Sequence, residues 1–586
     1  MTHWIRQAFA SRPALLAMLV LVGHTVWLRS VLVEGYFTQH DFVLLARLNG
    51  EALSGALLTE PLAGELSPVG MLLAWAVERA APLSWAGPTY AVLALHVLGA
   101  LLLWLVLSRL LEERWLRLPL FVAAVLTPLT LGPIVWWSLA LLHLPVQILF
   151  LAAVLALLLR VQEGWRHGPW IAGTAMTLLL LGNDRTLLLP WVVLLVLAGV
   201  LGGDQEGWRA RVRAAWSASP ALWGWMAVAC VVRAFVSVRE HGTALVSPEA
   251  WRSALDALLQ SGLPAVAGGP WSGEVVETHL TAAGPAVLVG GLLLLLLLDA
   301  LRRSGRPQGV VAGLGALLLL ASGLVLSASS AGASASGRFL TDAAVVAVVL
   351  LAVALRGTPV PRALVRRSGP SPAFLAVAVA VAVLASAAIT REALLPTLTG
   401  DDDRLYLANL AEGVASNPQA VLLDGPVPAG VMGPDLGEEA RLSVVASALR
   451  DRPSFGSASE FLSLVTEQGY VWGIDVYAPV RSVRGPNRDC GYPVTAQRRE
   501  IAMRRPVEDG AHVLRVDYFL DGDTYAVLDV AGERTTLPVR SGLHSLYVPV
   551  TRGYSSVSIA LESREHTLCV TGLAAGVPVP AQLPSS

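Results

Sequence analysis

Residues 139–159 read LALLHLPVQILFLAAVLALLL and contain no charged side chain. An α-helix needs about 20 mostly apolar residues to cross a bilayer, so this segment is predicted to span a membrane. The whole chain has the same character, because 54% of its 586 residues are hydrophobic and 15% are charged. Soluble domains average roughly 45–50% hydrophobic residues and about 25% charged residues. The composition therefore excludes an ordinary soluble enzyme and a disordered chain. A net charge of -1 gives no basic field for nucleic acid.

Ten further apolar segments resemble 139–159 in length and composition. The eleven predicted spans lie near 14–33, 87–108, 118–136, 139–159, 170–182, 186–202, 220–237, 283–301, 308–327, 339–355 and 372–390. Residues 66–81 are shorter and contain Glu78 and Arg79, so we interpret them as an interfacial or re-entrant helix. The first span follows a basic stretch but lacks a small-residue cleavage site, which indicates an uncleaved anchor.

Arginine is distributed unevenly between the two sides that these spans define. If the N-terminus lies inside, the inner segments carry 17 arginines and the outer loops carry 6. Cytoplasmic loops retain positive charge, so we predict that the N-terminus is cytoplasmic. An odd number of spans then places the tail, from residue 391 onward, outside the cytoplasm.

The tail differs in composition from the rest of the chain. It carries 17 Arg and 24 Asp or Glu residues, whereas residues 1–390 carry 25 Arg and 19 Asp or Glu residues. This change in charge indicates a membrane domain followed by an outer part. Residues 391–505 are predicted to mix helices (405–416 and 437–451) with a strand (420–427). Six short alternating segments within 506–586 predict a β-sandwich of jelly-roll type. Its tyrosines could bind carbohydrate or pack the sandwich core: Tyr518, Tyr525, Tyr547 and Tyr554.

The chain has three cysteines. Cys230 falls within a predicted span and is expected to be an inert core residue. Cys490 and Cys569 both fall in the predicted outer part, where an oxidising environment favours a disulfide between them. Neither their spacing nor neighbouring histidines indicate zinc.

Ionisable side chains at membrane depth are costly, so they are the natural functional candidates. The first outer loop, residues 34–86, carries His40 and Asp41 soon after the first span. Residues 42–58 are amphipathic and predict a helix in the membrane interface, which would hold Asp41 near the membrane surface. Asp41 would then face either a protein-lined cavity or water, as an ordinary loop acid does.

Further polar residues interrupt the spans on the same predicted side. Asp184 and Arg185 lie between the fifth and sixth spans, where a plain turn would also explain them. Arg338 and Asp342 are four residues apart and share a helix face, either as an ion pair or as part of an anion site. His143 is either a hydrogen-bonded helix residue or a member of the same site.

This arrangement resembles the GT-C superfamily of membrane glycosyltransferases, which have many spans, a long first outer loop with an acidic residue, and often an outer C-terminal domain. Asp41 occupies the place of that acidic residue. The segments WWSLALLHLP (136–145), GNDRTLLLP (182–190) and GRFLTDA (337–343) look like pieces of bacterial members that use polyprenyl-phosphate sugars. Many members have two adjacent acids in the first loop, whereas this chain has His40 and Asp41. The difference leaves open whether a divalent metal, Mg²⁺ or Mn²⁺, is used and whether the chain is active.

The resemblance implies transfer of a sugar, with inversion, from a polyprenyl-phosphate donor to a glycan or glycolipid of the cell envelope. The reaction would take place at the outer face of a bacterial plasma membrane. Asp41 would be the catalytic base, and Arg185 and Arg338 would bind the donor phosphate. The supporting residues would be His40, Asp184, His143 and Asp342. Two alternatives stay open: a transporter or flippase of lipid-linked sugars, and an inactive scaffold for envelope assembly.

Overall fold

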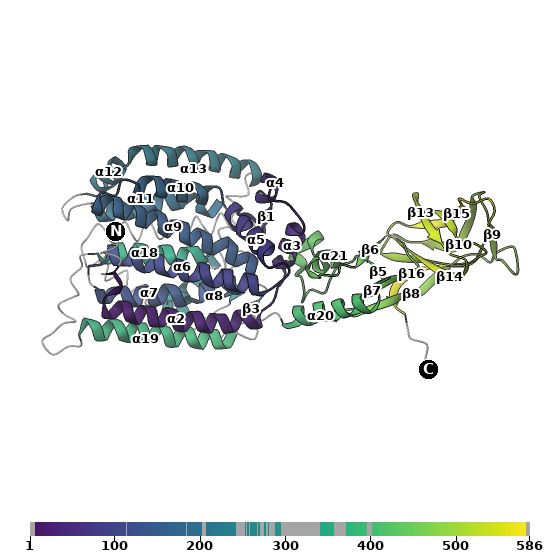
Figure 1. Ribbon diagram of the computed structural model, residues 1–586, viewed down its shortest axis with the longest axis horizontal. Helices are drawn as coiled ribbons and strands as arrows, with labels where there is room; N and C mark the ends of the chain where they lie inside the picture. Colours follow the sequence, from purple (N-terminus) through teal and green to yellow (C-terminus); the bar gives the residue numbers. More distant parts are fainter. Residues whose placement is uncertain are drawn as a thin grey trace. The chain divides into compact units, whose positions relative to one another are not determined.

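The computed structural model describes residues 8–112, 114–182, 184–201, 207–241, 340–356, 371–394, 401–456 and 458–581, with Arg6 and parts of 252–294. It divides into two compact units, Met1–Gly400 and Asp401–Ser586, and each is described by itself. The first unit consists mainly of helices whose axes are roughly aligned, and the second consists mainly of β-strands (Figure 1).

The helices of the first unit include several that coincide with predicted spans. They are α2 (Arg12–Glu34), α3 (His40–Leu48), α4 (Gly55–Leu58), α5 (Pro68–Ala80), α6 (Ala86–Leu110), α7 (Arg117–Leu126), α8 (Pro128–Val135), α9 (Trp137–Glu163), α10 (Gly168–Leu180), α11 (Leu189–Leu201), α12 (Trp208–Ala218), α13 (Pro220–His241), α18 (Leu340–Leu355) and α19 (Pro372–Leu394). Within the described residues, α2, α6, α9 and α19 are long and apolar enough to cross a membrane, and the number reaches six if two bent helix pairs each count as one span. The chain is therefore a multi-pass membrane protein. The spans predicted over 283–301 and 308–327 fall largely or wholly outside the described residues.

Two predicted helices are broken in the structure. The span predicted over 118–136 is divided into α7 and α8, which are bent by 43°. The cause is Pro128, because a proline disfavours helical geometry in the residue before it, and Thr127 has an extended ψ of 134°. The helix predicted over 42–58 is two helices, α3 and α4, separated by a segment in which Gly50 has a positive φ of 75°.

The first loop continues through a two-stranded hairpin, β1 (Pro61–Leu62) and β2 (Glu65–Leu66), into the short helix predicted near 66–81, which is α5. α5 packs against α9 at a point that the sequence explains. Pro145 of α9 has no N–H group, so it cannot donate the usual helix hydrogen bond to the carbonyl of Leu141, four residues earlier. Gly70 of α5 lies against this carbonyl, and a Cβ atom on Gly70 would be 2.7 Å from the Leu141 oxygen. The missing side chain thus lets the loop approach the α9 backbone closely.

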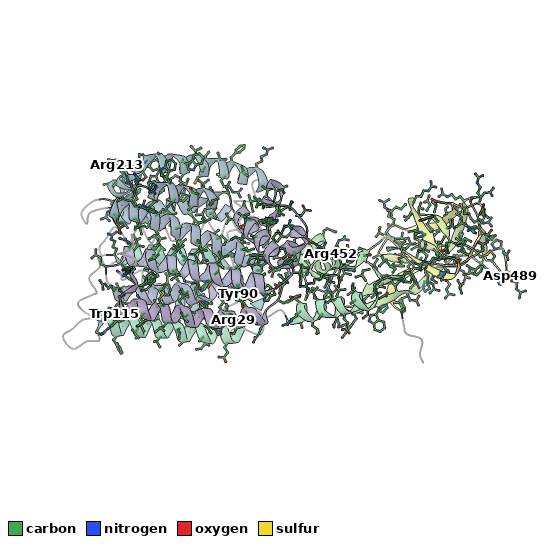
Figure 2. The ribbon with its side chains drawn as sticks, in the orientation of Figure 1. Arg29, Tyr90, Trp115, Arg213, Arg452 and Asp489 are labelled. Atoms are coloured by element: carbon green, nitrogen blue, oxygen red, sulfur yellow. A yellow bond between two sulfur atoms is a disulfide. The ribbon has the colours of Figure 1, made fainter. Side chains whose placement is uncertain are left out.

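The two ends of the first unit differ in sequence. In Figure 1, α3, α4 and α5 lie at one end and α12 lies at the opposite end. In Figure 2, Arg213 of α12 and Trp115 lie at the α12 end, whereas Arg29 and Tyr90 lie toward the other. This separation is the one required if the arginine-rich segments are cytoplasmic and the first loop is outside. The orientation itself stays a prediction.

We expect a cysteine introduced at Glu533 to react with a membrane-impermeant maleimide in intact cells, because the arginine distribution places the tail outside. Glu533 is exposed in the second unit, and the free Cys230 is buried, so it adds little background. Ala210→Cys in α12 is the matched inner control and should react only after permeabilisation. The opposite pattern at the two positions would refute the topology.

The second unit begins with α20 (Asp401–Ser416) and continues in two main sheets. The strands are β5 (Val421–Leu422), β6 (Ser454–Phe455), β7 (Leu462–Val465), β8 (Val471–Arg481), β9 (Tyr492–Val494), β10 (Arg499–Val507), β11 (His512–Leu520), β12 (Thr524–Val530), β13 (Glu533–Val539), β14 (Gly542–Val550), β15 (Tyr554–Leu561) and β16 (Leu568–Pro580). One sheet has the order β10-β15-β12-β13. The larger sheet has the order β14-β11-β16-β8-β7-β5-β6, and β9 also pairs with β16.

The two sheets share one apolar core, to which strands of both contribute buried residues. All six strands predicted after residue 506 are present, with the expected alternation: on β11, Tyr518 and Leu520 are buried and Phe519 is exposed. The jelly-roll type of this sandwich stays a prediction. The helix predicted over 437–451 is wrong, because Gly437 has a non-helical φ of 53° and only short helical turns form there.

Cys490 and Cys569 form the predicted disulfide, with Cα atoms 4.7 Å apart. Cys569 belongs to β16, and Cys490 immediately precedes the segment that leads into β9, a partner strand of β16. The bond therefore closes a long segment of chain at neighbouring strands of one sheet. Cys230 is buried and free, as expected.

Candidate functional site

Asp41 lies in the first turn of α3 and is fully buried. Its Oδ2 accepts a hydrogen bond from the N–H of Thr38 at 3.2 Å. Its Oδ1 accepts one from the N–H of Ser138 at 2.7 Å. Ser138 is the second residue of α9, where backbone N–H groups have no partner within the helix and the helix dipole favours negative charge. The carboxylate therefore joins the first outer loop to the N-terminus of α9.

Burial raises the pKa of Asp41 to about 6, because the ionised carboxylate loses its hydration. Hydrogen bonds from the Ser138 side chain and from the N–H groups of Ser138, Thr38 and Trp137 oppose this shift. A carboxyl group with a pKa near neutrality is both a stronger base than an exposed aspartate and still ionised at pH 7. Asp41 thus has the protonation behaviour that a general base needs.

A second polar pair joins α9 to α18. His143 Nδ1 lies 3.0 Å from Asp342 Oδ2, and the His143 side chain is buried. This contact orients the ring, so that with Nδ1 protonated the other nitrogen, Nε2, is left as an acceptor. His143 Nε2 and Asp342 Oδ1 are buried without hydrogen-bond partners among the described residues. They are therefore free to bind a hydroxyl group or water.

The two pairs occupy the same part of α9. Ser138 and His143 are five residues apart, which corresponds to about 7.5 Å of helix rise. Thr341, next to Asp342, donates its hydroxyl to the Leu129 carbonyl of α8 at 2.8 Å, which fixes the start of α18 beside α8. The structure thus gathers one loop acid and one histidine–acid pair around the N-terminal turns of α9.

The other predicted site residues are placed only in part. His40 is half-buried next to Asp41 at the start of α3. Asp184 and Arg185 belong to η2 (Asp184–Leu188), which follows α10. Gly182, just before η2, lies near the first loop, since a Cβ atom there would be 3.9 Å from the Leu66 carbonyl oxygen. Arg338 lies outside the described residues, so its contact with donor phosphate stays a prediction.

The buried ionisable residues that the sequence prediction did not select include His24 of α2, His96 of α6 and Arg391 of α19. The rings of His24 and His96 meet edge to face, with centroids 4.9 Å apart. The Arg391 guanidinium carbon lies 4.4 Å from the centroid of the Trp27 ring. His96 is the one ionisable residue among the Asp, Glu, Lys, Arg and His types in the predicted span 87–108, and that isolation was an available signal, because such residues in membrane helices are usually functional.

Among the described residues, no group of three or more His, Cys, Asp or Glu side chains is close enough to hold a metal ion. Neither Asp41 nor the His143–Asp342 pair has enough further His, Cys, Asp or Glu side chains of the described residues around it to complete a metal site.

Replacement of Asp342 by Asn should lower activity less than loss of the loop acid, because the amide can still contact His143 Nδ1 but no longer carries charge. His143→Ala removes the whole pair and should cost more, within the roughly 10²–10⁴-fold range of a lost acid–base group. The measurement is the initial rate of the purified variants in the transfer reaction that the resemblance implies, at saturating substrate. Leu149→Ala, a partly buried apolar position on α9, is the control for helix packing. Equal rates for His143→Ala and this control would exclude a functional role for the pair.

No family model matches the chain, and no curated protein does. Among solved structures, the chain is similar to the arabinofuranosyltransferase AftD from mycobacteria, with 12% identity, a TM-score of 0.33 and coverage of 95% of this chain but only 60% of AftD. It is also similar to ArnT from Cupriavidus metallidurans, a structure with bound undecaprenyl phosphate, with 16% identity, a TM-score of 0.40 and coverage of 75% of this chain and 89% of ArnT. At these values the matches assign no activity.

Proposed function

We propose that the chain transfers a sugar from a polyprenyl-phosphate donor to a glycan or glycolipid of the bacterial cell envelope, on the outer face of the membrane. The observation that carries this proposal is Asp41, a fully buried carboxylate with a pKa near 6 in the first loop of a multi-pass unit. A purely structural loop acid would more often be exposed and strongly acidic. The neighbouring His143–Asp342 pair adds a second polar group to the same helix end.

The reaction needs one base and one leaving group. An oxygen of Asp41 takes the proton of the acceptor hydroxyl as that hydroxyl oxygen forms a bond to the anomeric carbon. The bond between this carbon and the phosphate oxygen breaks, and its electron pair leaves with the polyprenyl phosphate. Attack opposite the leaving group inverts the anomeric centre.

The leaving phosphate needs cationic partners. Arg185 and Arg338 are proposed for this role, since guanidinium groups stay charged and bind phosphate oxygens in pairs. The approach of Gly182 to the Leu66 carbonyl oxygen of the first loop supports Arg185, which follows three residues later.

The second unit is proposed to bind the acceptor glycan. A polar cleft of about 600 Å³ lies on the four-stranded sheet and is lined by Arg498, Asp529, Ser556 and Ser558 among others. Tyr525, on β12 of the same sheet, is exposed and could stack on a sugar ring. Tyr525 and Asp529 share the outer face of β12, and hydroxyl, carboxylate and guanidinium groups on the same face as an exposed aromatic ring are the chemistry that a saccharide surface requires.

The proposed function is tested with the purified full chain in nanodiscs, a radiolabelled polyprenyl-phosphate sugar and an envelope glycan acceptor. We expect label on the acceptor and an equal amount of free polyprenyl phosphate. In liposomes, a flippase would instead move the intact donor between leaflets without forming product. A scaffold would do neither, so the three functions give three different results.

A further inference from the structure

The first outer loop meets α9 at two points that lie three residues apart. At the first point, Asp41 of α3 accepts a hydrogen bond from the N–H of Ser138. At the second point, Gly70 of α5 lies against the carbonyl oxygen of Leu141. Residues three apart are neighbours on one side of a helix. The contact at Leu141 therefore lies within one turn of the residue that binds the proposed base.

Gly70 occupies a position that has no room for a side chain. Glycine destabilises a helix relative to alanine, yet Gly70 is the third residue of α5 and is buried. A Cβ atom there would lie 2.7 Å from the Leu141 oxygen, 2.7 Å from Ser67 Oγ and 2.9 Å from Cδ2 of Leu62. Nonbonded carbon atoms normally stay about 3.5–4.0 Å apart. The Leu141 oxygen belongs to the backbone of α9, so it cannot rotate away as a side chain can.

The Leu141 carbonyl can receive the loop because of Pro145. This proline lies inside α9, where it supplies no N–H to the carbonyl four residues earlier and its ring crowds that carbonyl. The carbonyl is thus turned from its usual helix partner and is available for contact with the loop. Gly70 and Pro145 are therefore two parts of one contact, although they are far apart in the sequence.

The parts of the loop are tied to one another, so the position of α5 also sets the position of α3. The two helices are in contact. Trp75 Nε1 of α5 donates a hydrogen bond to the carbonyl of Glu51, just after α3, at 3.2 Å. Arg47 of α3 donates one to the carbonyl of Pro61 in β1. Asp41, in the first turn of α3, is therefore placed by the same body that Gly70 joins to α9.

The turn that carries Asp41 needs such support. Gln39, just before α3, has a positive φ of 38°, which is unfavourable for a residue with a side chain. The turn is closed by the N–H of Asp41, which donates to the Thr38 carbonyl at 2.7 Å. A strained backbone of this kind persists only where the surrounding structure holds it. The packing of the loop against α9 provides that structure.

We infer that the contact between Gly70 and the Leu141 carbonyl seats the first outer loop on α9 and holds Asp41 in its buried position. Gly70 is then a positioning residue, because it acts through Asp41. Its effect on catalysis rests on the proposed function, whereas its effect on the burial of Asp41 does not. Without this contact, water would reach the carboxylate, and its pKa would fall from about 6 toward the value near 4 of an exposed aspartate.

Gly70→Ala tests the inference by adding one methyl group at the contact. We expect the titration midpoint of Asp41 to fall from about 6 to about 5 or below, because the displaced loop exposes the carboxylate. The measurement is the infrared absorption of the protonated carboxyl group in the full chain in nanodiscs, as the difference from the same chain with Asp41→Asn. A midpoint that stays near 6 would overturn the inference.

Gly55→Ala is the matched control for this measurement. Gly55 belongs to α4 of the same loop, and a Cβ atom there would have no neighbour within 4 Å. The midpoint of Asp41 should therefore stay unchanged in Gly55→Ala. A shift equal to that of Gly70→Ala would show that any alanine in the loop has this effect, and it would overturn the role of the Leu141 contact.

Pro145→Ala determines whether Gly70 acts through Leu141. The replacement supplies an N–H to the Leu141 carbonyl and draws this carbonyl back into α9. Gly70→Ala should then shift the midpoint of Asp41 by no more than about half as much as it does in the wild-type background. Equal shifts in the two backgrounds would show that Gly70 does not act through Leu141 and would overturn the inference.

The rate of sugar transfer separates this inference from the proposed function. Gly70→Ala should lower kcat by roughly 10²-fold with little change in KM, as expected when a base is misplaced by about 1 Å. A lowered midpoint in a chain that transfers no sugar would support the contact and refute the proposed function. Transfer of sugar by a Gly70→Ala chain whose midpoint stays near 6 would refute the contact and leave the proposed function in place.

Discussion

Asp41→Asn is expected to lower the rate of sugar transfer by roughly 10²–10⁴-fold, which is the usual effect of losing a general base. The substitution keeps the volume of the side chain and removes its ability to take a proton. Asn can still accept one of the two N–H hydrogen bonds from Thr38 and Ser138, so the contact between α3 and α9 is weakened but not lost. The measurement is the single-turnover rate with bound donor.

A control is needed because the same carboxylate also joins the loop to α9. The thermal unfolding of Asp41→Asn should resemble that of the wild type, and Asp41→Glu, which keeps a displaced carboxylate, should retain part of the activity. A well-folded Asp41→Asn variant with wild-type rate would show that Asp41 is not the base. A variant that unfolds would instead assign the carboxylate to the structure of the loop.

Loss of the disulfide is expected to destabilise the second unit by about 4–5 kcal/mol in the chain-entropy model, because the bond closes a long loop. The two cysteines are 79 residues apart. The double replacement Cys490→Ser with Cys569→Ser should therefore lower the urea concentration at which the β16 amides lose protection from hydrogen exchange. Helices of the first unit should keep their protection.

Cys230→Ser is the matched control for this experiment, since Cys230 is free and belongs to the first unit. Reduction of the wild-type protein should reproduce the effect of the double replacement on β16. If neither change lowers the protection of β16, the disulfide does not stabilise the sheets.

Much of the fold follows from patterns within single segments. The runs at 14–33, 87–108 and 139–159 are long and apolar, and they form α2, α6 and α9. The alternation after residue 506 likewise gives all six predicted strands. Predictions failed where the backbone geometry of a single residue breaks a helix that the average hydrophobicity or periodicity of the surrounding segment predicts. Pro128 divides a span, and Gly437 interrupts a helix.

The sequence could indicate site residues only where they lie near one another in the chain or near the end of a predicted span. Asp41 was selected by its place after the first span, and His143 and Asp342 by their position at helix ends. Their contact joins residues 199 positions apart, so no local pattern could reveal it. His24 and His96 come from two separate apolar segments, and their rings meet only after α2 and α6 have packed.

The pH dependence of sugar transfer tests the central claim most directly. Asp41 acts as a base only when ionised, and its pKa is raised to about 6. The account therefore predicts that kcat/KM of the wild-type chain rises about tenfold per pH unit below pH 6 and levels off above it. In Asp41→Asn, the small remaining rate should no longer rise with pH below pH 6. A wild-type profile that is flat from about pH 5 to 8, or a rise that persists in Asp41→Asn, would contradict the assignment of Asp41 as the base.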